Sequence, residues 1–142
     1  MGVRTEFGTD TAWTFEPAPL SRGAEILKRY GWDGKKRVLV VCPINPFWWP
    51  VKPDLTKVAA LKLTGQYKEE HYKSIYFHAS GEEIDDKLDR YIEGLAQGVR
   101  AFQKHRDVFT IMVGMEKLDR MSCELLADRL ETRPPVLVHG EL

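Results

Sequence analysis

The side chains best suited to chemistry follow the apolar run at 38–42. Asn45 has an amide that can donate and accept hydrogen bonds, and Lys52 has a cation that can pair with a phosphate or a carboxylate. Between them, Trp48 and Trp49 have flat rings that suit the apolar face of a sugar. These residues predict a site for a sugar and an anionic donor. The two indoles would equally serve to anchor the loop on a partner domain, and that alternative stays open.

Three further side chains could transfer a proton or bind a ligand. His78 stands among aromatic residues just before a helical pattern, where an imidazole can act in acid–base chemistry or contact a phosphate. Glu116 follows the apolar run at 108–114, and its carboxylate can bind a sugar or ribose hydroxyl. His139 ends a third apolar run. The alternatives are a hydrogen-bonded structural histidine for His78 and a solvated strand end for His139.

Several common site motifs are missing from the sequence. No G-x-G-x-x-G follows the first apolar run, and neither G-x-x-x-x-G-K-[ST] nor G-x-S-x-G occurs. His71 and His78 stand seven residues apart, without acidic or cysteine ligands at metal spacing. We therefore expect no metal site and no bound cofactor.

The composition bounds the class of protein. A chain of 142 residues with 43% apolar and 30% charged residues predicts one globular domain. Lys+Arg and Asp+Glu balance at 21 each, so no global field favours nucleic acid or an anionic membrane. No apolar run approaches the roughly 20 residues of a membrane-spanning helix. Cys42 and Cys123 are interpreted as small core thiols of a reducing compartment, and we expect a cytoplasmic protein.

Strand and helix patterns alternate along the chain. The apolar runs at 37–42, 108–114 and 136–139 predict strands, the first of them a central strand of a parallel sheet, buried on both faces. A helix capped by Asp54 follows the first run, a Ser80–Glu83 capping box opens a long helix, and Asp119 caps a helix over 120–130. This order predicts an α/β fold, a Rossmann-like three-layer sandwich with parallel strands. The strands' carboxyl ends, where such sheets bind ligands, would then share one edge.

Two segments are expected. Residues 1–35 would be an inter-domain segment with a short helix capped at Ser21, and 36–142 an incomplete Rossmann-like domain with an insertion at 43–80. The last strand has no helix after it, which leaves a hydrophobic sheet edge open and predicts a homo-oligomer through that edge. The chain reads as a piece of a larger protein.

With these pieces placed, the chain resembles the polysaccharide pyruvyl transferase family, in particular a branch with an INPFWWPVKP-type loop. The likeness rests on CPINPFWWPVKP at 42–53, TDTAWTF at 9–15, YFHASG at 76–81 and GMEKLD at 114–119, and it covers essentially all of this sequence. It implies two Rossmann-type domains facing across a cleft, in a GT-B-type arrangement, of which this chain matches the end of the first and half of the second. The implied activity is transfer of a pyruvyl ketal from phosphoenolpyruvate to a sugar of a surface polysaccharide.

Within this resemblance, Asn45 and Lys52 would orient the anionic donor, Trp48 would stack on the sugar, and His78 would assist proton transfer. Glu116 and His139 would line the same cleft. The partners implied are a sugar or polysaccharide precursor and phosphoenolpyruvate, with no nucleic acid and no transmembrane segment.

The sequence departs from the family pattern in two places. Ile44 and Asn45 take the place of an arginine that contacts the donor in the family, and a later Arg/His-bearing segment would lie beyond Leu142. The chain is therefore expected to lack the complete active site. Two other functions stay open: a non-catalytic sugar- or nucleotide-sugar-binding module, and an interaction protein that docks through Trp48 and Trp49.

Overall fold

The computed structural model describes residues 16–67 and 75–138, and residues 1–15, 68–74 and 139–142 lie outside the described residues. The chain divides into two compact units, Met1–Lys35 and Lys36–Leu142. The role of the first unit as an inter-domain segment stays a prediction.

The described part of the first unit contains one helix, α1 (Leu20–Arg29). The predicted cap at Ser21 is wrong, because Pro19 is the N-cap residue and no side chain caps the helix. The helix ends at Arg29 with Tyr30 as its C-cap, and Gly31 follows with a φ of 98°, in the left-handed region that favours glycine. Ile26 is buried, whereas Leu20 is almost fully exposed.

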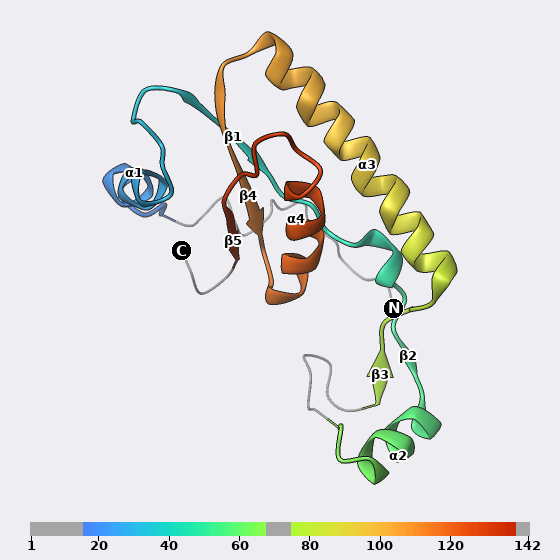
Figure 1. The fold of residues 1–142 in the computed structure, drawn as a ribbon. Coiled ribbons are helices and arrows are strands. Elements are labelled where there is room, and N and C mark those ends of the chain that lie inside the picture. The colour runs from blue at the N-terminus through green and yellow to red at the C-terminus, as the bar shows by residue number, and fades with distance from the viewer. Residues whose placement is uncertain (1–15, 68–74, 139–142) are drawn as a thin grey trace, which may run out of the picture. The chain divides into compact units, whose positions relative to one another are not determined.

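The second unit is built on three parallel strands, β1 (Arg37–Val41), β4 (Val108–Gly114) and β5 (Val136–Val138), in the order β1-β4-β5 (Figure 1). The register pairs Arg37 with Val108 in β1–β4 and Met112 with Val136 in β4–β5. The prediction of a parallel α/β sheet is confirmed.

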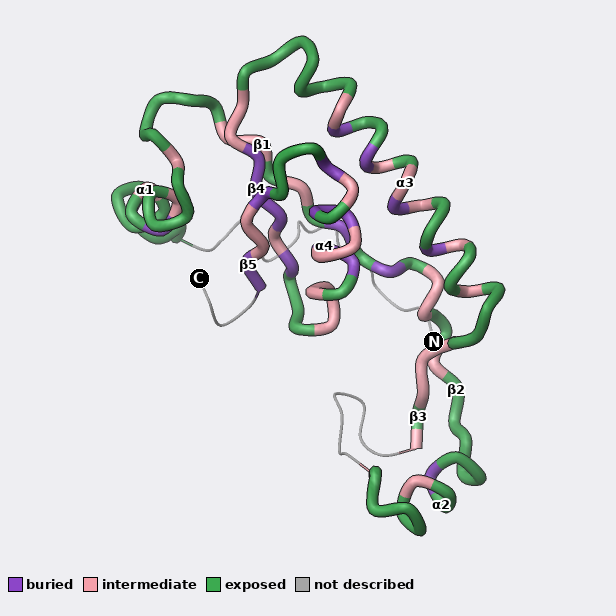
Figure 2. The backbone as a smooth tube through the Cα atoms, in the orientation of Figure 1, coloured by how far each residue is buried: buried purple, intermediate pink, exposed green. Residues whose placement is uncertain are grey.

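Two helices, α3 (Glu82–His105) and α4 (Arg120–Ala127), cover one face of this sheet. Their apolar stripes meet at Met112 of β4, and the buried residues of Figure 2 gather where β4, β5 and these helices face one another. The core cluster is Leu88, Ile92, Ala96, Val99, Met112, Cys123, Leu126, Ala127 and Leu130. Sheet and helices make two layers, and the third layer of the predicted sandwich stays a prediction.

The expectation that 37–42 is a central strand buried on both faces is wrong. Among the described strands β4 is central and β1 lies at an edge, with Val40 52% exposed. Cys42 is exposed rather than a core thiol, whereas Cys123 is confirmed as a buried one. A short apolar run has the same composition in either place, so the run itself does not distinguish an edge strand from a central one.

The long helix is confirmed, but its predicted cap is wrong. Gly81, at φ 119°, is the N-cap of α3, and no side chain caps the helix. Glu83 instead accepts a hydrogen bond from Lys87 one turn later. Three carboxylates in the first turn, Glu82, Glu83 and Asp85, stabilise this helix start through the helix dipole.

The insertion at 43–80 contains a short 3-10 turn η2 (Pro46–Trp48), the strand pair β2 (Lys52–Pro53) and β3 (Tyr76–Phe77), and α2 (Leu55–Leu63). β2 and β3 pair antiparallel, with Lys52 opposite Phe77. Asp54 caps α2 by accepting a hydrogen bond from the Lys57 N–H at 2.8 Å, as predicted. The strand pair returns the chain from α2 to the end of η2.

Candidate functional site

Trp48, Trp49 and His78 form a group that we call the aromatic–histidine cluster. The imidazole centroid of His78 lies 5.1 Å from that of Trp48 and 6.0 Å from that of Trp49, the second in an edge-to-face arrangement. The Ala79 N–H donates to the Trp48 carbonyl at 3.1 Å, so the backbone beside His78 is tied to η2. Two of the predicted site residues, Trp48 and His78, therefore lie together.

The cluster presents one ring to solvent. Trp49 is 55% exposed, whereas Trp48 and His78 are half-buried. Lys52 is exposed and pairs with Phe77 in the β2–β3 ladder, which places its backbone beside the residue that precedes His78. A flat apolar ring, an imidazole and an ammonium group thus lie on neighbouring parts of the insertion.

Asn45 fixes the loop that carries the cluster. Its Oδ1 accepts a hydrogen bond from the Phe47 N–H at 3.0 Å and so caps η2. The residue is 5% exposed, and among the described residues its Nδ2 has no hydrogen-bond partner. The Phe47 ring packs edge-to-face on Tyr91 of α3 with centroids 6.2 Å apart, which ties η2 to the long helix. Asn45 therefore fixes the start of η2, the turn that contains Trp48 and is followed by Trp49.

Glu116 is part of a local turn. Its side chain accepts from the Asp119 N–H, while Asp119 Oδ2 accepts from the Glu116 N–H at 2.9 Å. This reciprocal pair closes the 3-10 turn η3 (Lys117–Asp119). The prediction that the Asp119 side chain caps the following helix is wrong, because that carboxylate bonds to Glu116 instead. None of the contacts that join described residues links Glu116 to the cluster.

His139 lies outside the described residues, and so do His71 and the 9–15 segment. Within the described ranges, no three His, Cys, Asp or Glu side chains are grouped as a metal site would require.

Burial, followed by the nearby Asp119 carboxylate, raises the pKa of the Cys123 thiol to about 11, so this buried thiol stays protonated at neutral pH.

The stacking role was predicted for Trp48, but Trp49 is the more exposed of the two rings, and the structure places it against His78 as well. The signal was present in the sequence as an indole adjacent to Trp48 and followed by Pro50.

In comparisons with known proteins, no protein-family model, curated protein or solved structure matches the chain. Nor does any helix of the described chain have the length and apolar character needed to cross a membrane.

Proposed function

We propose that the chain binds a sugar at the aromatic–histidine cluster and acts as part of an enzyme of the polysaccharide pyruvyl transferase type. The observation that carries this proposal is the placement of His78 against Trp48 and the half-exposed Trp49, in the loop beyond the carboxyl end of β1. Aromatic rings beside a polar group suit pyranoses, because one sugar face is apolar and its rim carries hydroxyls.

Each residue then has a chemical role. The Trp49 ring stacks on the sugar, and His78 accepts the proton of one sugar hydroxyl as that oxygen bonds to C2 of phosphoenolpyruvate and C3 takes up a proton to become a methyl group. A second hydroxyl of the same sugar then displaces phosphate from C2, which completes the ketal, and its proton leaves with the phosphate. Lys52, exposed on the neighbouring strand, pairs with the donor's phosphate or carboxylate. Glu116 and His139 follow β4 and β5 in the sequence, and they would bind the sugar or the donor.

We propose a fold and a cellular location that agree with this activity. The parallel sheet with α3 and α4 would be half of the second domain of a GT-B-type protein. A reducing, cytoplasmic compartment fits the two free thiols, Cys42 and Cys123.

The test is an NMR titration of the full 142-residue chain with mono- and oligosaccharides, with and without phosphoenolpyruvate. We expect the indole N–H signals of Trp48 and Trp49 and the ring protons of His78 to shift first. Trp49→Ala should weaken sugar binding about tenfold, in line with the worth of an aromatic contact. Trp32→Phe is the control, because Trp32 belongs to the other unit. Sugar binding that Trp49→Ala leaves unchanged would refute the assignment.

A second function is favoured by a different observation. The exposed apolar residues include Trp49 and Val40, which is compatible with a protein that docks another chain through its loop and sheet edge. Concentration-dependent association, lost in the Trp48→Ala/Trp49→Ala double variant and measured by sedimentation without sugar, would favour this function over sugar binding.

A further inference from the structure

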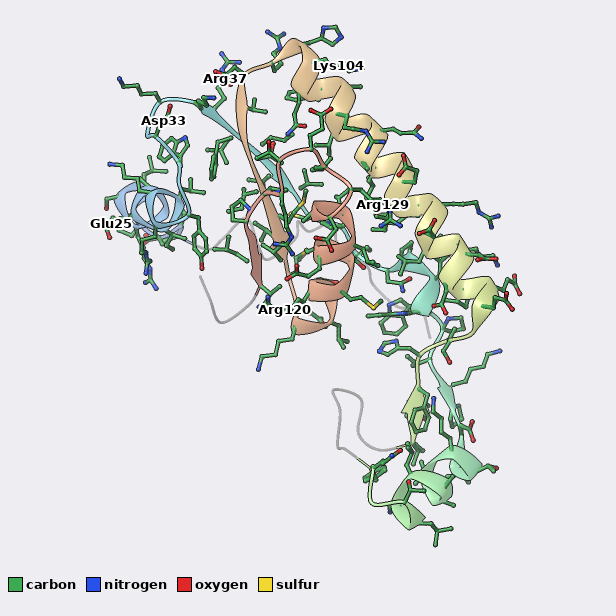
Figure 3. All side chains as sticks on the ribbon, viewed as in Figure 1. Glu25, Asp33, Arg37, Lys104, Arg120 and Arg129 are labelled. Carbon is green, nitrogen blue, oxygen red and sulfur yellow. The ribbon has the colours of Figure 1, made fainter. Side chains whose placement is uncertain are left out.

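A group of basic residues collects at the edge of the sheet where β1 and β4 begin, away from the aromatic–histidine cluster. The β1–β4 register places Arg37 opposite Val108, so the residues just before each strand are neighbours. A 2.7 Å ion pair between Lys36 and Asp107 joins the two segments. Figure 3 shows Arg37 and Lys104 at this same end of the sheet. We call Lys36, Arg37, Lys104, His105 and Arg106 the amino-edge basic patch; all five are exposed.

The patch is a local concentration of charge in a chain whose total is balanced. Its four permanent cations face a single carboxylate within these segments, that of Asp107. Over the whole chain, Lys+Arg and Asp+Glu are equal at 21. The first half of α3 carries the opposite sign, with Glu82, Glu83 and Asp85 in its first turn. The total charge therefore conceals a positive end of the sheet.

The helix dipole explains only part of this pattern. Cations in the last turn of a helix are stabilised by the carbonyl end, which accounts for Lys104 and His105. It does not account for Lys36, which precedes β1, or for Arg37, which opens it. It also leaves Phe102 unexplained: this residue falls on the apolar stripe of α3, yet it is 46% exposed two residues before Lys104.

We infer that the amino-edge basic patch docks the chain on an anionic lipid surface. Clustered Lys and Arg side chains are attracted to acidic headgroups, and a neighbouring exposed aromatic residue suits the boundary between headgroups and acyl chains. A membrane fits this patch better than a nucleic acid does. Its cations lie at the start of β1 and at the end of α3 rather than along a helix that could enter a groove.

The consequence is a peripheral protein with its two surfaces at opposite ends of β1. The patch lies at Arg37, and the cluster follows the other end of the same strand. Attachment through the patch would therefore leave the cluster accessible. This inference does not depend on the ligand of the cluster, and it holds whether or not that ligand is a sugar.

The test is co-sedimentation of the 142-residue chain with vesicles of phosphatidylcholine alone and of phosphatidylcholine mixed with phosphatidylglycerol. We expect binding to the anionic vesicles only, and weaker binding as the salt concentration rises. Each cation removed should weaken binding roughly fivefold, so the triple variant Arg37→Gln/Lys104→Gln/Arg106→Gln should lose about a hundredfold. Phe102→Gln should weaken binding to anionic vesicles further.

The matched control is Lys62→Gln/Arg90→Gln/Lys117→Gln, which removes the same charge from exposed positions outside the patch. It should bind anionic vesicles as the unchanged chain does. Equal losses in the two triple variants would overturn the inference, because net charge alone would then explain the binding. So would the absence of vesicle binding, including the case in which the chain binds only a polyanion such as single-stranded DNA. Circular dichroism of each variant confirms that it is folded.

Discussion

The sheet with α3 and α4 and the insertion at 43–80 are stabilised in different ways. In the first region Ile92, Met112, Cys123 and Leu126 are all fully buried in one cluster. In the insertion at 43–80, the described residues that are buried are Pro43, Asn45 and Val58, and they do not form one cluster. The cluster-bearing loops depend instead on the Asn45 and Asp54 caps, the Ala79–Trp48 hydrogen bond and ring contacts. Substitutions in the first region should therefore change stability, and those in the insertion should change the candidate site.

The largest effect is expected from Met112→Ala. This side chain is fully buried where β4 meets α3 and α4, and the cavity left should lower the free energy of unfolding by about 3 kcal/mol. Val58→Ala, the matched truncation in the insertion, removes less buried surface and should cost about 1 kcal/mol. Urea unfolding followed by circular dichroism measures both. If the two costs were equal, the contrast between the regions would be lost.

Gly114→Ala should lower the free energy of unfolding by about 2 kcal/mol through overpacking. A methyl group at Gly114, the last residue of β4, would lie 2.8 Å from Val138 Cγ1 and 3.0 Å from Asp119 Cβ. Gly98→Ala is the control, because that position in α3 is open to solvent and nothing lies within 4 Å of the added methyl. There the better helix propensity should raise stability by up to about 1 kcal/mol. Thermal melts of both variants should therefore move in opposite directions.

Asn45→Ala should cost about 1 kcal/mol of stability through loss of the η2 cap. Its more informative effect is on geometry, because the cap fixes Phe47 and Trp48, against which His78 lies. The indole ring currents should displace the NMR signals of the His78 ring protons, and Asn45→Ala should move those signals toward ordinary values. Asn45→Asp keeps the acceptor oxygen and should restore them. Displaced signals that persist in Asn45→Ala would mean that the cap does not position the cluster.

The sequence predicted the main elements where a period or a run is long enough to carry information. The stripe through Leu88, Ile92 and Val99 repeats at helical spacing, and 108–114 is a long apolar run, so α3 and β4 were expected. The edge position of β1 was not predicted, because the order of the strands in the sheet is decided by the topology and not by the composition of a single strand. The exposure of Val40 follows from that position.

The sequence singled out the residues of the aromatic–histidine cluster, but it did not predict that they lie against one another. Trp48 and His78 are thirty residues apart and are brought together by two-residue strands, which are too short to leave a pattern in the sequence. Glu116 was expected to be available to a ligand, yet it forms a capping box with Asp119. Two carboxylates three residues apart can cap each other's backbone N–H, and that signal was readable.

The smallest effect on the free energy of unfolding is expected from surface charges in the sheet–helix region. Hydrogen bonds from Arg100, and then from Gln97, hold the pKa of Glu93 below its ordinary value of 4.5. Because the carboxylate is favoured in the folded state, its contribution is present above pH 4.5 and is lost as the pH falls through the lower folded pKa. Arg100→Gln should therefore lower the stability slightly at neutral pH and leave it unchanged at about pH 3, so that the acid-side loss of stability becomes shallower. Urea midpoints measured from neutral pH down to about pH 3 follow this loss. If the Arg100→Gln curve ran parallel to that of the unchanged chain, other carboxylates would be responsible for the loss of stability in acid, and the Glu93–Arg100 pair would contribute nothing to the stability of the sheet–helix region.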